Sequence, residues 1–188
     1  YSSAASDVYK RQPYGCSKLA GDLYAQDYGK VYGLRTVVFR MSCVYGPRQF
    51  GVEDQGWLAW LTIATITGRP ITIYGDGKQV RDILYVDDLV RAFDAFLQRQ
   101  ELLSGEVFNI GGGPENTLSL LELLAMLEQL TGKRTEMSFS NWRPSDQRVY
   151  ITDVSKAKEK LDWNPKVCPE EGVERLVSWV LQNKDVFK

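Results

Sequence analysis

The sequence predicts an α/β or mixed α+β protein, because short apolar segments rich in β-branched residues alternate almost throughout with segments of helical periodicity. With 188 residues, the chain can hold one full domain, or one domain and part of another, with a substantial core. It shows no internal repeat, low-complexity tract or obvious flexible linker.

The first predicted elements are a helix and a buried strand. Pro13 suits the first turn of a helix, which we end between residues 30 and 33, and the β-branched, apolar segment 35–41 reads as a strand. Gly46-Pro47-Arg48 then breaks the chain, and a loop leads to a tryptophan-rich helix over about 56–67.

The middle of the chain continues the alternation. We expect strands at 71–74 and 83–86, and a helix that Asp87-Asp88 can cap. The predicted buried stripe of that helix is Leu89, Val90, Phe93, Phe96 and Leu97.

The last part begins with a strand at 106–110 and a glycine turn at 111–113. Ser119-x-x-Glu122 is a capping box that opens a leucine-rich helix ending at Gly132. The remaining expected elements are a strand at 136–139, a polar loop around 143–146, a short helix at 155–161 and a helix from 169 to about 182.

Charge and residue types exclude several classes of function. Twenty-three basic and twenty-four acidic residues give a net charge of −1, so no electrostatic case exists for nucleic acid or an anionic membrane. Histidine is absent, and the three cysteines show no paired spacing typical of a zinc site or a disulfide framework. No apolar stretch approaches the ~20 residues that span a bilayer. We expect no metal, no nucleic-acid or membrane partner, and a cytoplasmic location.

Tyr14 and Lys18 are the most informative pair. Their spacing places a phenol and an ammonium on one face of the predicted first helix, where the positive charge favours the tyrosinate, a base near neutral pH. A surface pair on an amphipathic helix is the alternative. Tyr74 and Lys78 share the spacing but flank a glycine turn, so they need not share a face.

Five ordered motifs between Pro13 and about Val180 define a resemblance. They are Tyr14-x-x-x-Lys18, Arg40-Met41-Ser42-Cys43-Val44-Tyr45-Gly46-Pro47-Arg48, Val80-Arg81-Asp82-Ile83, Asn109-Ile110-Gly111-Gly112 and Arg143-Pro144-Ser145-Asp146. Together they resemble the extended short-chain dehydrogenase/reductases that act on nucleotide sugars. The segments 48–57 and 75–82 look most like the subfamily of CDP-paratose (CDP-tyvelose) 2-epimerases.

The resemblance implies the C-terminal part of a Rossmann-type domain together with a smaller α/β substrate-binding lobe. Residues 13–48 would be a remnant of the NAD-binding domain, and 49–188 mainly the substrate lobe, with segments around 83–110 returning to the Rossmann domain. Residues 1–12 match the family badly and are expected to be a foreign head. No room exists before Tyr14 for the glycine-rich dinucleotide unit, so we expect the chain alone to be inactive.

By the same resemblance, Tyr14 is the catalytic acid/base, and Lys18 holds the nicotinamide ribose and lowers the pKa of the tyrosine. The implied reaction is NAD-dependent epimerisation through a transient keto-sugar, with no net redox change. Tyr14, Lys18, Met41, Ser42 and Val44 would contact NAD. The Tyr14 helix could supply a homodimer interface, with Leu23 and Tyr24 as candidates.

The implied ligand is a nucleotide-diphosphate sugar, with a CDP-sugar favoured. Arg81 and Arg143 would grip the diphosphate, because guanidinium groups match phosphate oxygens in a bidentate way. The alternative for each is a surface salt bridge, with Asp82 and Asp146 as obvious partners. The other expected substrate-binding residues are Cys43, Arg48, Gln55, Thr72, Ile73, Tyr74 and Asp146.

Several readings stay open from the sequence. Cys43 could be a small buried hydrophobe instead of a sugar contact. Trp60 is expected to pack in the substrate lobe, whereas Trp57 could border the sugar. A 4-epimerase, 4,6-dehydratase or decarboxylase of the same family would share Tyr14, Lys18 and both arginines. The chain could also be a nucleotide-sugar-binding fragment without chemistry.

Overall fold

The computed structural model describes residues 13–144 and 146–187, so the head 1–12 lies outside the described residues. Its helices are α2 (Pro13–Tyr32), α3 (Trp57–Thr67), α4 (Val86–Leu103), α5 (Leu120–Thr131), α6 (Ser155–Leu161), α7 (Pro169–Gln182) and the 3₁₀ turn η1 (Lys184–Phe187). Its strands are β1 (Val37–Met41), β2 (Cys43–Tyr45), β3 (Ile71–Tyr74), β4 (Val80–Tyr85), β5 (Glu106–Ile110), β6 (Thr117–Ser119), β7 (Met137–Ser140) and β8 (Val149–Tyr150).

Parallel pairing dominates the sheets, as the alternation of strands and helices predicts. β1 pairs with β5 and β2 pairs with β4, both in parallel. β4 also pairs with β6 in antiparallel and with β8 in parallel, while β3 pairs with β7 in parallel. The α/β prediction is therefore confirmed, although the short strands β2, β6 and β8 were not predicted.

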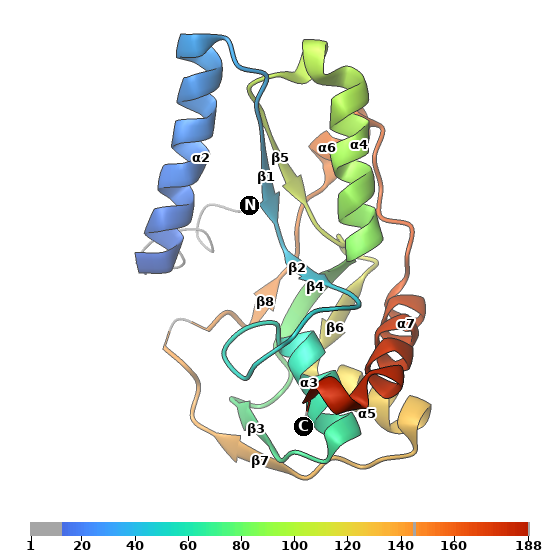
Figure 1. The fold of residues 1–188 in the computed structure, drawn as a ribbon. Helices are drawn as coiled ribbons and strands as arrows, with labels where there is room; N and C mark the ends of the chain where they lie inside the picture. Colours follow the sequence, from blue (N-terminus) through green and yellow to red (C-terminus); the bar gives the residue numbers. More distant parts are fainter. Residues whose placement is uncertain (1–12, 145, 188) are drawn as a thin grey trace.

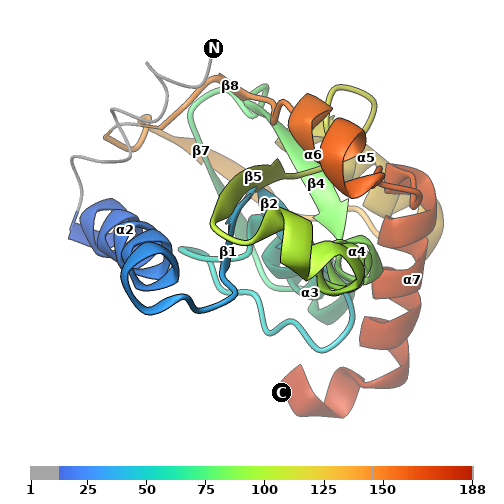
Figure 2. The same cartoon turned by 90° about the horizontal axis from the view of Figure 1, so that it is seen from above.

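The two halves of the molecule have separate hydrophobic cores (Figure 1). Toward the top of that view, α4 and α6 cover the β1–β5 pair around Phe108, Ile110 and Leu161. Toward the bottom, α3, α5 and α7 pack around a larger cluster that includes Ile63, Ile73 and Leu123. The view from above shows α2 and α4 on opposite sides of β1 (Figure 2).

A single residue connects the sheet of β1 and β5 to the sheet of β2 and β4. The chain passes from β1 to β2 at Ser42, whose backbone N–H donates to the Ile110 carbonyl at 3.1 Å. The turn after β5 lies against β4, because Ile83 donates to the Asn116 carbonyl at 2.8 Å and Gly113 donates to the buried Asp82 carboxylate at 3.3 Å. These hydrogen bonds fix the positions of β2 and β4 relative to the end of β1.

Helix α4 differs from its prediction. Asp87 and Asp88 do not cap it, because the helix begins at Val86 after Tyr85. The predicted buried stripe is wrong for Val90, Phe93 and Leu97, which are 52%, 46% and 57% exposed. It is confirmed for Phe96, which is buried together with Ala92. The helical period alone cannot show which side of an apolar helix meets the sheet.

Helix α5 begins as predicted. The Ser119 hydroxyl accepts from the backbone N–H of Glu122 at 3.2 Å, and the Glu122 carboxylate accepts from the Ser119 backbone N–H at 2.7 Å. The Ser119 hydroxyl and its backbone N–H lower the pKa of Glu122. The helix ends at Gly132, which adopts φ +67°.

Removing this cap should weaken the fold. We expect Ser119→Ala to lower the free energy of unfolding by about 1 kcal/mol, measured by urea denaturation. Because the folded pKa of Glu122 is depressed, its contribution is present above the unfolded pKa of about 4.3 and is lost as pH falls through the folded value. Ser138→Ala, at an exposed position of β7, is the matched control. An equal effect of both changes would contradict the capping role.

Candidate functional site

Tyr14 and Lys18 lie on the same face of α2. The Lys18 ammonium is 5.4 Å from the centroid of the Tyr14 ring, and Tyr14 is 60% exposed. None of the residues of α2 is buried, and an ion pair of 2.7 Å between Asp22 and Arg40 connects the helix to β1. The shared face is confirmed; the acid/base role of Tyr14 stays a prediction.

The segment 41–44 lies where β1 gives way to β2. Met41 is half exposed at the end of β1, and the Ser42 hydroxyl is buried without a hydrogen-bond partner among the described residues. The carboxyl ends of parallel strands are where ligands bind in open α/β sheets. Both side chains are therefore placed where a bound molecule could meet them.

Cys43 is tied into the protein interior. Its sulfur accepts a hydrogen bond from the Trp57 indole N–H at 3.4 Å, and both side chains pack against the larger core. Burial raises the pKa of the Cys43 thiol. These contacts favour the structural reading of Cys43, and they show Trp57, like Trp60, packing on the core.

Arg143 lies at the centre of a cluster at the end of β3. Its guanidinium carbon is 4.0 Å from the centroid of the Tyr74 ring, and it forms an ion pair of 3.0 Å with Asp54. The Tyr74 hydroxyl donates to Glu53 at 2.9 Å, and Glu53 is 3.9 Å from the Arg143 guanidinium. Glu53 and Asp54 could not be predicted as partners of Arg143, because they precede it by about ninety residues.

Arg81 has the salt-bridge partner that the sequence offered. It pairs with Asp146 at 2.8 Å, and the two side chains are only 15% and 23% exposed. Arg143, in contrast, pairs with Asp54 and not with Asp146. Both arginines predicted to bind the diphosphate therefore form ion pairs with carboxylates.

The other predicted substrate-binding residues lie on the loop between β2 and α3 and on β3. Gln55 is exposed and its backbone pairs with Val52, while Arg48 is exposed with a φ of 67°. Thr72 is half-buried on β3. Ile73 is fully buried, so any contact with a ligand would come from its backbone.

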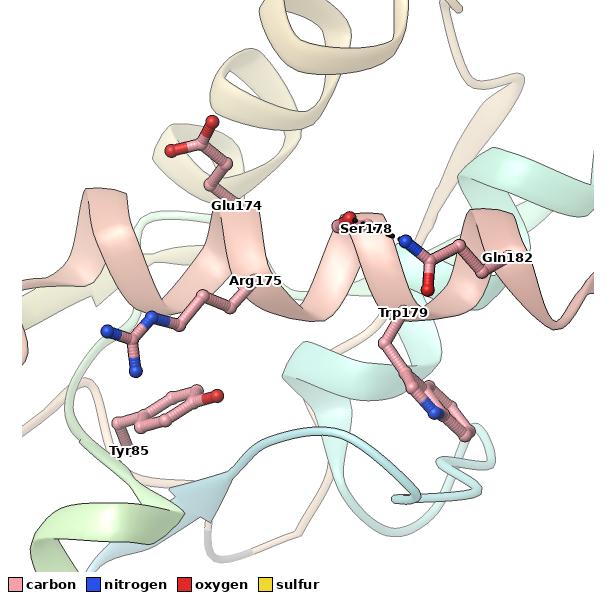
Figure 3. A pocket seen from close by; sticks show the side chains of 6 residues that line it. All are labelled: Tyr85, Glu174, Arg175, Ser178, Trp179 and Gln182. Carbon is pink, nitrogen blue, oxygen red and sulfur yellow. Dashed lines mark hydrogen bonds between the residues drawn. The ribbon is translucent and has the colours of Figure 1, made fainter.

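The hollows of the surface lie elsewhere. One open pocket lies along α7 and is lined by Tyr85, Glu174, Arg175, Ser178, Trp179 and Gln182 (Figure 3). Another lies on α2, beside Leu23 and Tyr24. Neither is lined by a predicted catalytic or substrate-binding residue, so these hollows do not define the candidate site.

The described part of the chain contains no group of three or more metal-ligating side chains suited to a metal ion. Nor does any of its helices have the length and apolar character needed to cross a membrane.

Parallel strand pairs with flanking helices and a Tyr-x-x-x-Lys pair on a helix face define an α/β protein of the Rossmann type. The chain belongs to the NAD dependent epimerase/dehydratase family, whose model matches residues 2–111. This match confirms the predicted family and its cofactor, NAD. The solved structures described below confirm the fold class.

The relatives of this chain include nucleotide-sugar epimerases. It is 44% identical over 174 residues to CDP-paratose 2-epimerase of Salmonella typhi, covering 89% of this chain and 51% of that protein. It is 36% identical to UDP-glucuronate 4-epimerase of Thermodesulfobacterium geofontis, covering 94% and 52%. The chain thus spans about half the length of these relatives.

Solved structures agree with the sequence relatives. The UDP-glucuronic acid 4-epimerase of Bacillus cereus, in complex with UDP-glucuronic acid and NAD, superposes with a TM-score of 0.81 at 34% identity, covering 92% of this chain and 53% of that one. The dTDP-glucose 4,6-dehydratase of Bacillus anthracis, in complex with NAD, gives 0.78 at 33% identity, covering 93% and 54%.

Proposed function

We propose that this chain carries the nucleotide-sugar-binding lobe of an NAD-dependent epimerase, and that the intact protein converts CDP-paratose to CDP-tyvelose by 2-epimerisation. The observation that carries the proposal is the Arg143–Tyr74 stack at the end of β3, which combines an anion-binding fork with an aromatic surface. The 44% identity to a CDP-paratose 2-epimerase supports the choice of substrate.

The residues toward the cofactor fit this chemistry. Tyr14 is accessible beside a cation, Met41 is half exposed, and the buried Ser42 hydroxyl has a free hydrogen-bonding capacity among the described residues. Together with Lys18 and Val44 they would hold NAD, which when bound takes up and returns a hydride. Tyr14, as tyrosinate, would take the proton of the sugar hydroxyl, and the Lys18 ammonium would stabilise its ionised form.

Two other functions are kept as candidates. A 4-epimerase or 4,6-dehydratase activity is favoured by the 4-epimerase and 4,6-dehydratase relatives at similar coverage of this chain. Nucleotide-sugar binding without turnover is the candidate for the 188 residues by themselves, and the coverage of about half of each relative favours it.

The assembly proposal concerns the outer face of α2. Leu23 and Tyr24 on that face are 57% and 67% exposed, as a homodimer interface in the intact protein would require. We also propose that the intact protein is cytoplasmic.

Calorimetric titration with CDP, UDP, GDP and dTDP tests the function. We expect the unaltered chain to prefer CDP, and Arg143→Ala to weaken that binding roughly tenfold to hundredfold, because a charged hydrogen-bonding fork is lost. Arg99 lies on α4 and forms a surface ion pair with Asp162. Arg99→Ala should therefore leave the affinity unchanged. Preference for another nucleotide would move the proposal to another activity of the family. No binding by a folded chain would refute it for these residues.

A further inference from the structure

Residues 142–148 connect the two places where the substrate arginines lie. At one end, Trp142 packs on Gly75, directly after β3; a Cβ added to Gly75 would lie 2.7 Å from the Trp142 ring. At the other end, the Arg148 carbonyl accepts from the Val80 N–H at 2.8 Å, next to Arg81 on β4. Arg148 therefore lies beside the strand that carries Arg81 and over the Trp142 ring that packs on Gly75.

Two of the three arginines at this site have carboxylate partners, and Arg148 has none among the described residues. Arg81 is neutralised by Asp146, and Arg143 by Asp54 with Glu53 nearby. Among the described residues, no carboxylate lies within ion-pair distance of Arg148. A diphosphate carries more negative charge than arginines already paired with carboxylates can balance, because those carboxylates repel it.

The aromatic contact gives Arg148 a defined place. Its guanidinium carbon is 5.4 Å from the centroid of the Trp142 ring. Stacking on a ring holds the planar guanidinium while leaving its N–H groups available, since the ring contacts its face and the donors lie in its plane. The backbone bond to Val80 fixes the base of the same side chain.

We propose that Arg148 is a third arginine of the diphosphate site, held by Trp142 and free of a carboxylate partner so that it meets the incoming anion first. The inference rests on the proposed nucleotide-sugar function and adds a residue that the motif comparison does not include. Arg81 and Arg143 would complete the site by exchanging their carboxylates for phosphate oxygens.

The test compares Arg148→Gln, Arg148→Lys and the control Arg99→Gln in the 188-residue chain. With CDP as the calorimetric probe, we expect roughly tenfold weaker binding for Arg148→Gln, an intermediate loss for Arg148→Lys, and no change for Arg99→Gln. The loss should shrink at high salt, since screening weakens the charge contribution. Binding of cytidine, which has no phosphate, should be the same for all variants.

Circular dichroism and the urea midpoint establish that each variant is folded, so a loss of binding is not a loss of structure. CDP affinity equal to that of the unaltered chain in Arg148→Gln, while Arg143→Ala remains weakened, would overturn the role of Arg148 alone. Equal losses for CDP and cytidine would also overturn it, because the contact would not be to phosphate. Failure of the unaltered chain to bind any nucleoside diphosphate would instead overturn the proposed function, and this inference with it.

Discussion

Asp88→Ala is expected to lower the free energy of unfolding by about 3 kcal/mol, because a buried carboxylate that accepts several hydrogen bonds is lost. Asp88 is fully buried on α4, although Asp is rarely so without partners. Its carboxylate accepts the backbone N–H groups of Lys166 and Val167 at 3.1 Å and pairs with Arg91. These bonds attach α4 to the segment before α7.

The effect is large because the substitution removes the acceptor of several groups that bond to the Asp88 carboxylate. The buried backbone N–H of Val167 and the partly buried N–H of Lys166 would lose their acceptor, and the Arg91 charge would lose its partner. Urea unfolding followed by circular dichroism measures the loss. Asp88→Asn keeps the shape and one acceptor but not the charge, so we expect an intermediate value.

The neighbouring carboxylate is the matched control. The Asp87 side chain is 59% exposed and lies 3.5 Å from the Arg175 guanidinium, so Asp87→Ala should change stability little. A similar loss for Asp87→Ala and Asp88→Ala would show that helix charge, and not the buried network, determines the effect.

Gly112→Ala is expected to cost about 3 kcal/mol, at the upper end of overpacking effects. A Cβ at Gly112 would lie 2.2 Å from the Ile83 carbonyl oxygen and 2.9 Å from the Asn116 Cβ. The carbonyl belongs to β4 and cannot rotate away as a side-chain tip can. The turn would have to move from β4, with loss of the Ile83–Asn116 and Asp82–Gly113 hydrogen bonds.

This turn supports the strand that carries Arg81, so nucleotide binding should weaken together with stability in Gly112→Ala. Thermal and urea unfolding measure the first effect, and CDP titration of the folded fraction measures the second. Gly21→Ala is the control, because open space surrounds that glycine in the exposed helix α2. There alanine should stabilise the helix by about 0.5–1 kcal/mol. A neutral result at Gly112 would mean that the turn adapts without strain.

Local signals predicted most of the elements. The Ser119–Glu122 capping box and Gly132 marked helix ends that the structure has within a residue or two, since these signals act within one turn of a helix. The ordered motifs likewise identified the family, because each is a short contiguous run. The two-residue strand β8 and the three-residue strand β6 were missed, since so few residues have no recognisable period.

Contacts between distant residues were decided only by the tertiary structure. The sequence offered Asp82 and Asp146 to both substrate arginines, yet Arg143 pairs with Asp54, and Asp82 faces the Gly113 turn. Asp88, predicted only as a possible helix cap, is buried and bonds to residues almost eighty positions away. The physical reason is that the partner of a charge depends on which segments pack together, and neither periodicity nor spacing along the chain carries that information.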